Sequence, residues 1–256
     1  MRCKYLTTLA IVFLSGTATA EGEYPEAYVR RPQVLHERML QLRGDVVLPL
    51  HNGTAGQGIV IAPSAEYGIT DELQVALRHD RSLCFNKCGD VYKGFGLEAK
   101  YLFFHPQNFS LSAFGGPSID HFDPFILQAH LGLGFWFGVD KFAVNGNLQV
   151  GLGLTNRSTH LGVLGNPDTI ALNVQPAYNF TPQLVAFADT GFNGVLDGFG
   201  DYWAIPLGVG AFYTIDRKLD LGGDFRFPRL IAASHTGGLD YRQVDLFVRY
   251  RFDFSR

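Results

Sequence analysis

The sequence has few cysteines, no long apolar run beyond its first twenty residues, and no excess of basic charge. Only three of 256 residues are Cys, and after Ala20 no run of about 18 apolar residues occurs, so no segment is long enough for a membrane-spanning helix. The 21 Lys and Arg residues are outnumbered by 24 Asp and Glu residues, and no basic patch is present. These absences exclude a helical membrane protein and a nucleic-acid partner, and we expect no cofactor.

Residues 1–20 are typical of a secretory signal peptide. Arg2 and Lys4 give the charged start, Tyr5–Leu14 is apolar, and Ala18-Thr19-Ala20 supplies the small residues of a cleavage site. Because the apolar stretch is only about half of the ~20 residues that a spanning helix needs, an uncleaved anchor is disfavoured. We therefore expect Sec-type export and removal of this segment, which leaves 19 basic against 24 acidic residues.

Two cysteines remain after cleavage, Cys84 and Cys88, in one short segment. An exported protein meets an oxidising compartment, which favours a small loop disulfide between them. A metal site is disfavoured because neither a His nor a third Cys lies close by.

The final segment, Val244–Phe254, carries the clearest secondary-structure signal. Apolar residues alternate with a set that is mostly charged, and a period of two places these sets on opposite faces of a β-strand. The pattern recurs along the chain. A strand with one apolar and one charged face, repeated behind a secretory leader, favours a transmembrane barrel over a soluble sandwich.

Turn residues divide the chain into twelve predicted strands. Five short turns, rich in Asp, Asn, Pro and Thr, alternate with six longer loops. The short turns are Ile69–Glu72, His105–Asn108, Gly138–Lys141, Asn179–Pro182 and Ile215–Lys218, and the loops lie near 51–57, 80–91, 116–124, 155–168, 192–201 and 230–240. An even strand number with long loops at one end predicts an all-β, antiparallel up-and-down barrel over residues 37–256, with both termini periplasmic.

Aromatic residues that are expected at one height on the barrel wall give an independent check of the barrel prediction. They are expected to face lipid where strands approach the short turns: Tyr67, Tyr101, Phe103, Phe135, Phe137, Tyr178, Tyr213, Phe252 and Phe254. Such a ring is the girdle that anchors a barrel at the membrane interface.

With this closing strand, leader and turn asymmetry, the chain resembles the Gram-negative outer-membrane β-barrel proteins, in particular porin-like or uncharacterised transporter members. The resemblance is architectural and covers almost all of the mature chain. It implies a location in the bacterial outer membrane, contact with its lipid, and recognition of the last strand by the barrel-assembly machinery, here through Tyr250, Phe252 and Phe254. One departure is that Ser255 and Arg256 follow the last aromatic residue.

The alternation also predicts a polar lumen with six basic and seven acidic residues, a near balance that argues for weak ion selectivity or internal pairing. Many of these charges fall on the first strand and the last two, which must meet to close the barrel. They form either a structural seam of paired charges or a constriction that sorts a polar or zwitterionic solute. The candidate lining residues are Arg43, Asp45, Glu98, Lys100, His130, Asp224, Arg226, Asp245, Arg249 and Arg251.

The mature amino-terminal stretch, residues 21–36, is predicted to be a periplasmic segment. It is long enough to lie in the lumen, although a disordered tail is the usual state of a terminus. Twelve strands lie between the eight of a filled barrel and the 16–18 of a water-filled porin, so both a narrow pore and a plugged one are possible.

Three functions remain open from the sequence. The first is a passive channel for small polar solutes, and the second is a non-conducting structural or surface-interaction barrel. The third is an omptin-like hydrolase that uses Asp120, His121 and Asp123 in an outer loop, where no second carboxylate pair is clearly placed opposite them. We expect the protein not to be an enzyme.

Overall fold

The structure is a computed structural model. It describes residues 24–51, 58–79, 83–88, 91–92, 94–157, 165–197, 199–233 and 237–254. The predicted signal peptide lies outside these residues. In the described part, no helix has the length and apolar character needed to cross a membrane. The strands are β1 (Met39–Pro49), β2 (Ile59–Gly68), β3 (Leu73–Arg78), β4 (Leu83–Phe85), β5 (Phe95–Phe104), β6 (Phe109–Phe122), β7 (Phe125–Val139), β8 (Phe142–Gly153), β9 (Thr169–Asn179), β10 (Leu184–Val195), β11 (Trp203–Ile215), β12 (Leu219–Ala232) and β13 (Gln243–Asp253).

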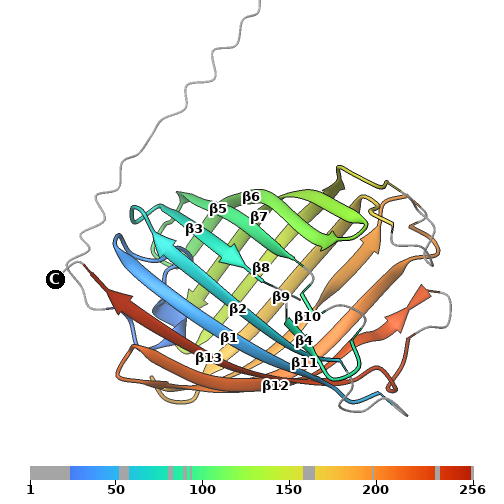
Figure 1. Cartoon of the computed structure of the whole chain (residues 1–256). Coiled ribbons are helices and arrows are strands. Elements are labelled where there is room, and N and C mark those ends of the chain that lie inside the picture. Colours follow the sequence, from blue (N-terminus) through green and yellow to red (C-terminus); the bar gives the residue numbers. More distant parts are fainter. Residues whose placement is uncertain are drawn as a thin grey trace, which may run out of the picture.

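Twelve of these strands form a closed antiparallel barrel (Figure 1). Each pairs with its neighbours in chain order, and β1 closes the ring by pairing with both β13 and β2. The three-residue β4 lies outside the ring, and the strand it pairs with is the start of β2. The prediction of a twelve-strand up-and-down barrel is therefore confirmed.

The five predicted short turns all lie at one end of the barrel, which we call the short-turn end. Between β7 and β8 only Asp140 and Lys141 separate the strands, and Asp140 has a φ of 51°. The turn between β11 and β12 likewise has Asp216 at φ 49°. Short polar side chains tolerate this left-handed backbone, which explains why Asp occupies these positions. Met39 of β1 pairs with Asp253 of β13, so the barrel also begins and ends here.

One predicted loop is wrong. Residues 116–124 contain Gly, Pro, Ser and Asp and were expected to form a long connection, but β6 runs to Phe122 and β7 begins at Phe125. The pairing continues through Pro117 and Ala129, and an irregularity between Ile119 and His121 absorbs the change of register. A bulge of this kind lets a strand carry residues that ordinarily favour turns.

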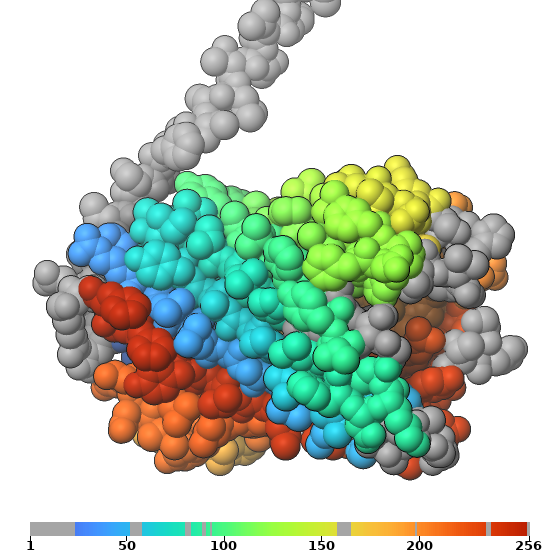
Figure 2. Space-filling model, in the orientation of Figure 1, coloured from blue at the N-terminus to red at the C-terminus, as the bar shows by residue number. Residues whose placement is uncertain are grey.

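The outer face of the barrel is apolar, as a lipid-facing wall requires. All of the predicted girdle aromatics except Phe135, which is partly buried, are at least 37 % exposed. Figure 2 shows the side chains of β1 directly against those of β13 along the closing seam. The alternation read from the sequence thus separates an apolar outside from a polar inside.

Candidate functional site: the lumen and its amino-terminal segment

Residues 24–38, which we call the amino-terminal segment, cross the lumen at the short-turn end. Tyr28 donates a hydrogen bond of 3.0 Å to Gln175 on β9. On the other side of the lumen, the backbone N–H of Leu35 donates to Gln74 on β3 at 2.9 Å. Val34 is almost completely buried between these two anchors. Of the two placements considered for this stretch, the lumen is the one observed, and the expectation of a free tail is wrong for residues 24–36.

Arg31 attaches this segment most firmly to the wall. Its guanidinium donates to Asp220 on β12 at 2.8 Å and to the hydroxyl of Thr214 on β11, also at 2.8 Å. Asp220 has no exposed surface, and it also accepts hydrogen bonds from Arg249 and Arg251 of β13. Three arginines therefore share one buried carboxylate, and loss of that carboxylate would leave buried charges without a partner.

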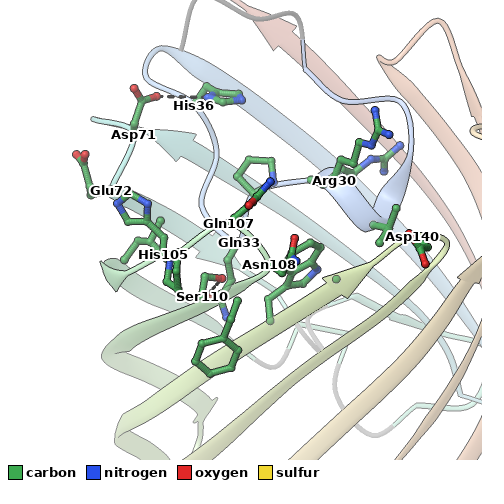
Figure 3. Close-up of a pocket in the computed structure, with 18 residues that line it drawn as sticks. Arg30, Gln33, His36, Asp71, Glu72, His105, Gln107, Asn108, Ser110 and Asp140 are labelled. Atoms are coloured by element: carbon green, nitrogen blue, oxygen red, sulfur yellow. Dashed lines mark hydrogen bonds and ion pairs between the residues drawn. The ribbon is translucent and has the colours of Figure 1, made fainter. Parts of the chain in front are cut away.

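Two cavities lie on either side of the amino-terminal segment. The mouth cavity, of about 600 Å³, opens among the short turns. At its rim His36 lies 3.4 Å from Asp71 of one short turn, and Arg30 lies beside Asp140 of another (Figure 3). The inner cavity, of about 310 Å³, lies deeper in the barrel. The residues that line both cavities are Arg31, Pro32, Gln33 and Trp136. This thin layer separates the lumen from its mouth.

Seven of the ten predicted lining residues lie together on β1, β12 and β13. Arg43 donates to Asp45 with a distance of 2.8 Å from Nε, and Arg226 reaches Asp224 at 3.0 Å. Arg43 and Arg249 are directly opposite each other in the β1–β13 register, and both guanidinium groups lie over the ring of Phe247, at 4.7 and 5.7 Å. The charged seam expected from the sequence is present as a group of neighbouring side chains.

The other three predicted residues lie on β5 and β7, away from this seam. Glu98 accepts a hydrogen bond of 2.8 Å from Arg78, and its second oxygen lies 3.4 Å from Nε2 of His130. Lys100, two residues further along β5, lines the inner cavity. The ten candidates therefore do not form one ring but two separate groups on different parts of the wall.

Sequence reasoning missed several lumen residues. Asp189 on β10 was not singled out, although Arg226 donates to it at 3.2 Å. The lumen also contains a cluster of buried aromatic residues, Phe187, Phe212 and Phe247, against which Tyr28 packs. Burial raises the pKa of the Tyr28 phenol above its usual value. The sequence signal that indicates a lumen position for Phe187 and Asp189 is their two-residue spacing from Val185, which places all three on one face of β10.

Comparison with known proteins gives a clear result for the fold alone. No family model matches the chain, and no curated protein matches it. The solved structure of the NanC porin aligns with a TM-score of 0.62 at 9 % identity, covering 82 % of this chain and 98 % of that one. The KdgM porin aligns with a TM-score of 0.56 at 9 % identity, covering 83 % and 99 %. A KdgM structure in complex with disordered oligogalacturonate aligns at 0.57, with 10 % identity and coverage of 84 % and 99 %.

A closed barrel with an apolar outer face is the sheet architecture that can span a bilayer, because no strand edge is left unpaired. The protein is a β-barrel of the bacterial outer membrane. It has the fold of the porins.

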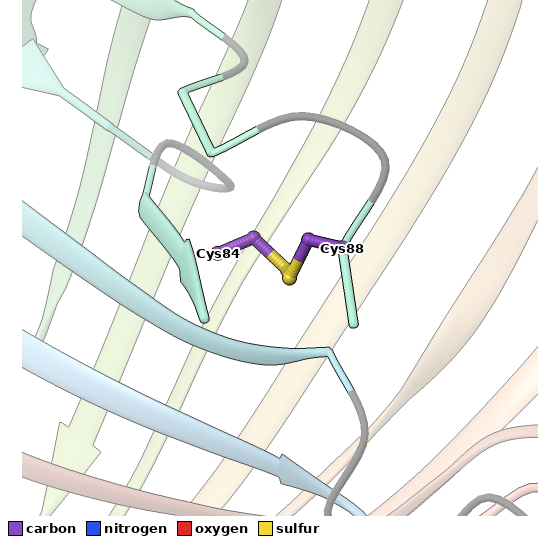
Figure 4. Close-up of a disulfide and its surroundings, with 2 residues drawn as sticks. All are labelled: Cys84 and Cys88. Carbon is purple, nitrogen blue, oxygen red and sulfur yellow. A yellow bond between two sulfur atoms is a disulfide. The ribbon is translucent and has the colours of Figure 1, made fainter. Parts of the chain in front are cut away.

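The end of the barrel opposite the short turns carries the disulfide and the candidate hydrolase residues. Cys84 of β4 is joined to Cys88 by a disulfide, beside the start of β2 (Figure 4). Because β4 lies outside the twelve-strand ring, this bond ties a loop rather than the barrel wall. Asp120 and His121 lie at the end of β6, and the backbone N–H of Asp123 donates to His121 at 3.2 Å.

Proposed function

We propose that this outer-membrane barrel is a passive channel for small polar solutes, with its short-turn end facing the periplasm. The observation that carries the proposal is the charged lining of the lumen. In the described strands and the amino-terminal segment, seven basic residues (Arg31, Arg43, Arg78, Lys100, Arg226, Arg249 and Arg251) accompany seven acidic ones (Asp45, Glu66, Glu98, Asp189, Asp220, Asp224 and Asp245). A wall of this kind replaces the hydration of a polar solute.

The neighbouring structures bear on the kind of solute. The KdgM structure contains an oligogalacturonate, an acidic carbohydrate. The inner cavity here has about the volume of the smallest ligand sites, near 300 Å³. We therefore propose a solute of the size of a monosaccharide or an amino acid.

A second candidate function is a barrel that does not conduct. It is supported by the amino-terminal segment, whose buried residues Val34 and Leu35 lie inside the lumen. If the amino-terminal segment always stays in the lumen, the barrel does not conduct. Its function would then be structural, or would depend on interactions of the loops opposite the short-turn end. The same electrical measurement separates the two functions.

We propose further that the protein is not a hydrolase. His121 already accepts the backbone hydrogen bond from Asp123, an arrangement that ties a tight turn rather than exposes a base. Asp120→Ala is expected to leave the folded protein without any change in peptidase activity. A peptidase activity that is lost in this variant would contradict the proposal.

The closing strand is proposed to be the segment that the barrel-assembly machinery recognises. Tyr250 and Phe252 of β13 and Phe254 directly after it all face outward, and their rings lie next to one another in sequence order. Truncation before Phe252 that leaves assembly in the outer membrane unchanged would contradict this role.

The channel is tested by the conductance of the refolded mature protein in a planar bilayer. We expect discrete current steps with little preference between cations and anions, because the described lumen charges balance. Reversal potentials under a salt gradient measure this preference. A folded barrel that gives no steps would remove the channel and favour the non-conducting function.

A further inference from the structure

We infer that the inner cavity is a binding site for a small solute that carries both an ammonium and a carboxylate group. This inference rests on the proposed channel function and names the solute class of that lumen. It is carried by one buried acidic group, Asp224, and by two basic groups that line the same cavity, none of which has a complete set of partners.

The acidic side consists of Asp224 on β12, which lines the cavity, and Asp245 of β13 lies directly opposite it in the strand register. They are 7 % and 8 % exposed, and the Oδ1 atom of each is buried without a hydrogen-bond partner among the described residues. Buried polar atoms in proteins are nearly always paired, so the unpaired oxygen of Asp224 in the wall of the cavity indicates that a donor is missing there. The carboxylate of Asp245 in the opposite register position adds negative charge beside Asp224, which favours a donor that is itself positive.

Neighbouring basic residues do not supply that donor. Arg226 reaches the other oxygen of Asp224, at 3.0 Å, and also Asp189 at 3.2 Å. Arg43 is engaged with Asp45. An ammonium group would donate to the free oxygen of Asp224.

The basic side consists of Lys100 and Arg249, which line the same cavity. Lys100 makes no hydrogen bond or close ion pair with any residue that the structure describes, although Glu66 and Glu98 attract it from further away. The Nε atom of Arg249 is buried and has no partner in the described part. A solute carboxylate is the group that both would accept as a partner.

Simpler solutes would leave one side unsatisfied. A carboxylate without an amine would leave Asp224 and Asp245 facing each other, and an amine without a carboxylate would leave Lys100 unpaired. A metal ion is disfavoured because no cluster of three His, Cys, Asp or Glu residues within the described ranges has suitable geometry. The rings of Phe212, Phe247 and Tyr28 offer an apolar surface to the carbon chain that joins the two charged ends.

The experiment uses Trp136 as the reporter, because it lines the cavity and the only other tryptophan is Trp203. Full-length mature protein with Trp203→Phe is refolded in detergent and titrated with 4-aminobutyrate, butyrate and butylamine, which share a four-carbon chain. The fluorescence change gives each Kd. We expect 4-aminobutyrate to bind at least about tenfold more tightly than butyrate or butylamine, because each of these compounds lacks one charge-assisted contact that 4-aminobutyrate makes.

Two variants test which side chains bind the ammonium end and the carboxylate end of the solute. Asp224→Asn is expected to reduce the affinity for 4-aminobutyrate to that for butyrate, and Lys100→Gln to reduce it to that for butylamine. Asp197→Asn, at an exposed position between β10 and β11, is the matched control and is expected to change nothing. Heat-dependent mobility in gel electrophoresis verifies that every variant is folded.

Equal affinities for the three compounds would overturn the inference. So would an unchanged affinity in Asp224→Asn, which would mean that a proton shared with Asp245, rather than a solute, satisfies this carboxylate. If the protein conducts but binds the three compounds equally, the channel function is supported and the binding site is contradicted. If the barrel does not conduct but still prefers 4-aminobutyrate, the binding site is supported and the channel function is contradicted.

Discussion

Deletion of residues 24–36 is expected to increase the single-channel conductance of the barrel by on the order of tenfold. The segment contacts β3 on one side of the lumen and β9 on the other, and only the layer that contains Arg31, Pro32 and Gln33 separates the two cavities. Without it the mouth and inner cavities become one passage. Bilayer recordings of the deletion variant and the mature protein under identical salt measure the ratio.

A variant in which residues 24–36 are replaced by a Gly/Ser sequence of equal length is the appropriate control. It keeps a flexible chain at the mouth but removes the anchoring contacts, so its conductance should approach that of the deletion. Arg31→Ala should give intermediate, fluctuating currents because the other contacts remain. If the deletion leaves the conductance unchanged, the segment does not obstruct the passage.

The barrel itself was predictable because lipid and water impose opposite requirements on alternate residues. In β13 this alternation is almost uninterrupted, and its register with β1 follows from it. The end of β6 is the exception, because a loop was predicted there and a strand is observed. Pro117 and the glycines before it favour turns by local propensity, but pairing with β7 overrides that preference.

The lumen was predictable in composition but not in its pairing. Alternation places Arg43 and Asp245 inside the barrel, yet it places Phe247 there as well, and no local pattern distinguishes a lining aromatic from a lining charge. Arg31 was missed for a different reason. It lies in a segment without strand periodicity, and its partner Asp220 is 189 residues away in the sequence. Only the closed fold brings the two together.

Substitution of Asp220 by Asn is expected to lower the free energy of unfolding by about 3–5 kcal/mol, the usual cost of breaking a buried ion pair by removing one partner. Asp220 is fully buried and holds Arg31, Arg249 and Arg251. The amide keeps the shape of the side chain but removes the charge. Reversible urea unfolding in lipid vesicles, followed by tryptophan fluorescence, measures the difference.

Asp216→Asn is the matched control, because Asp216 lies exposed in the turn before β12 and Asn tolerates its φ of 49°. Its effect should stay within about 0.5 kcal/mol. Arg31→Ala should destabilise the parent protein more than it destabilises Asp220→Asn, since the two residues interact directly. Equal effects of Arg31→Ala in both backgrounds would mean that Asp220 is not what holds the amino-terminal segment across the lumen.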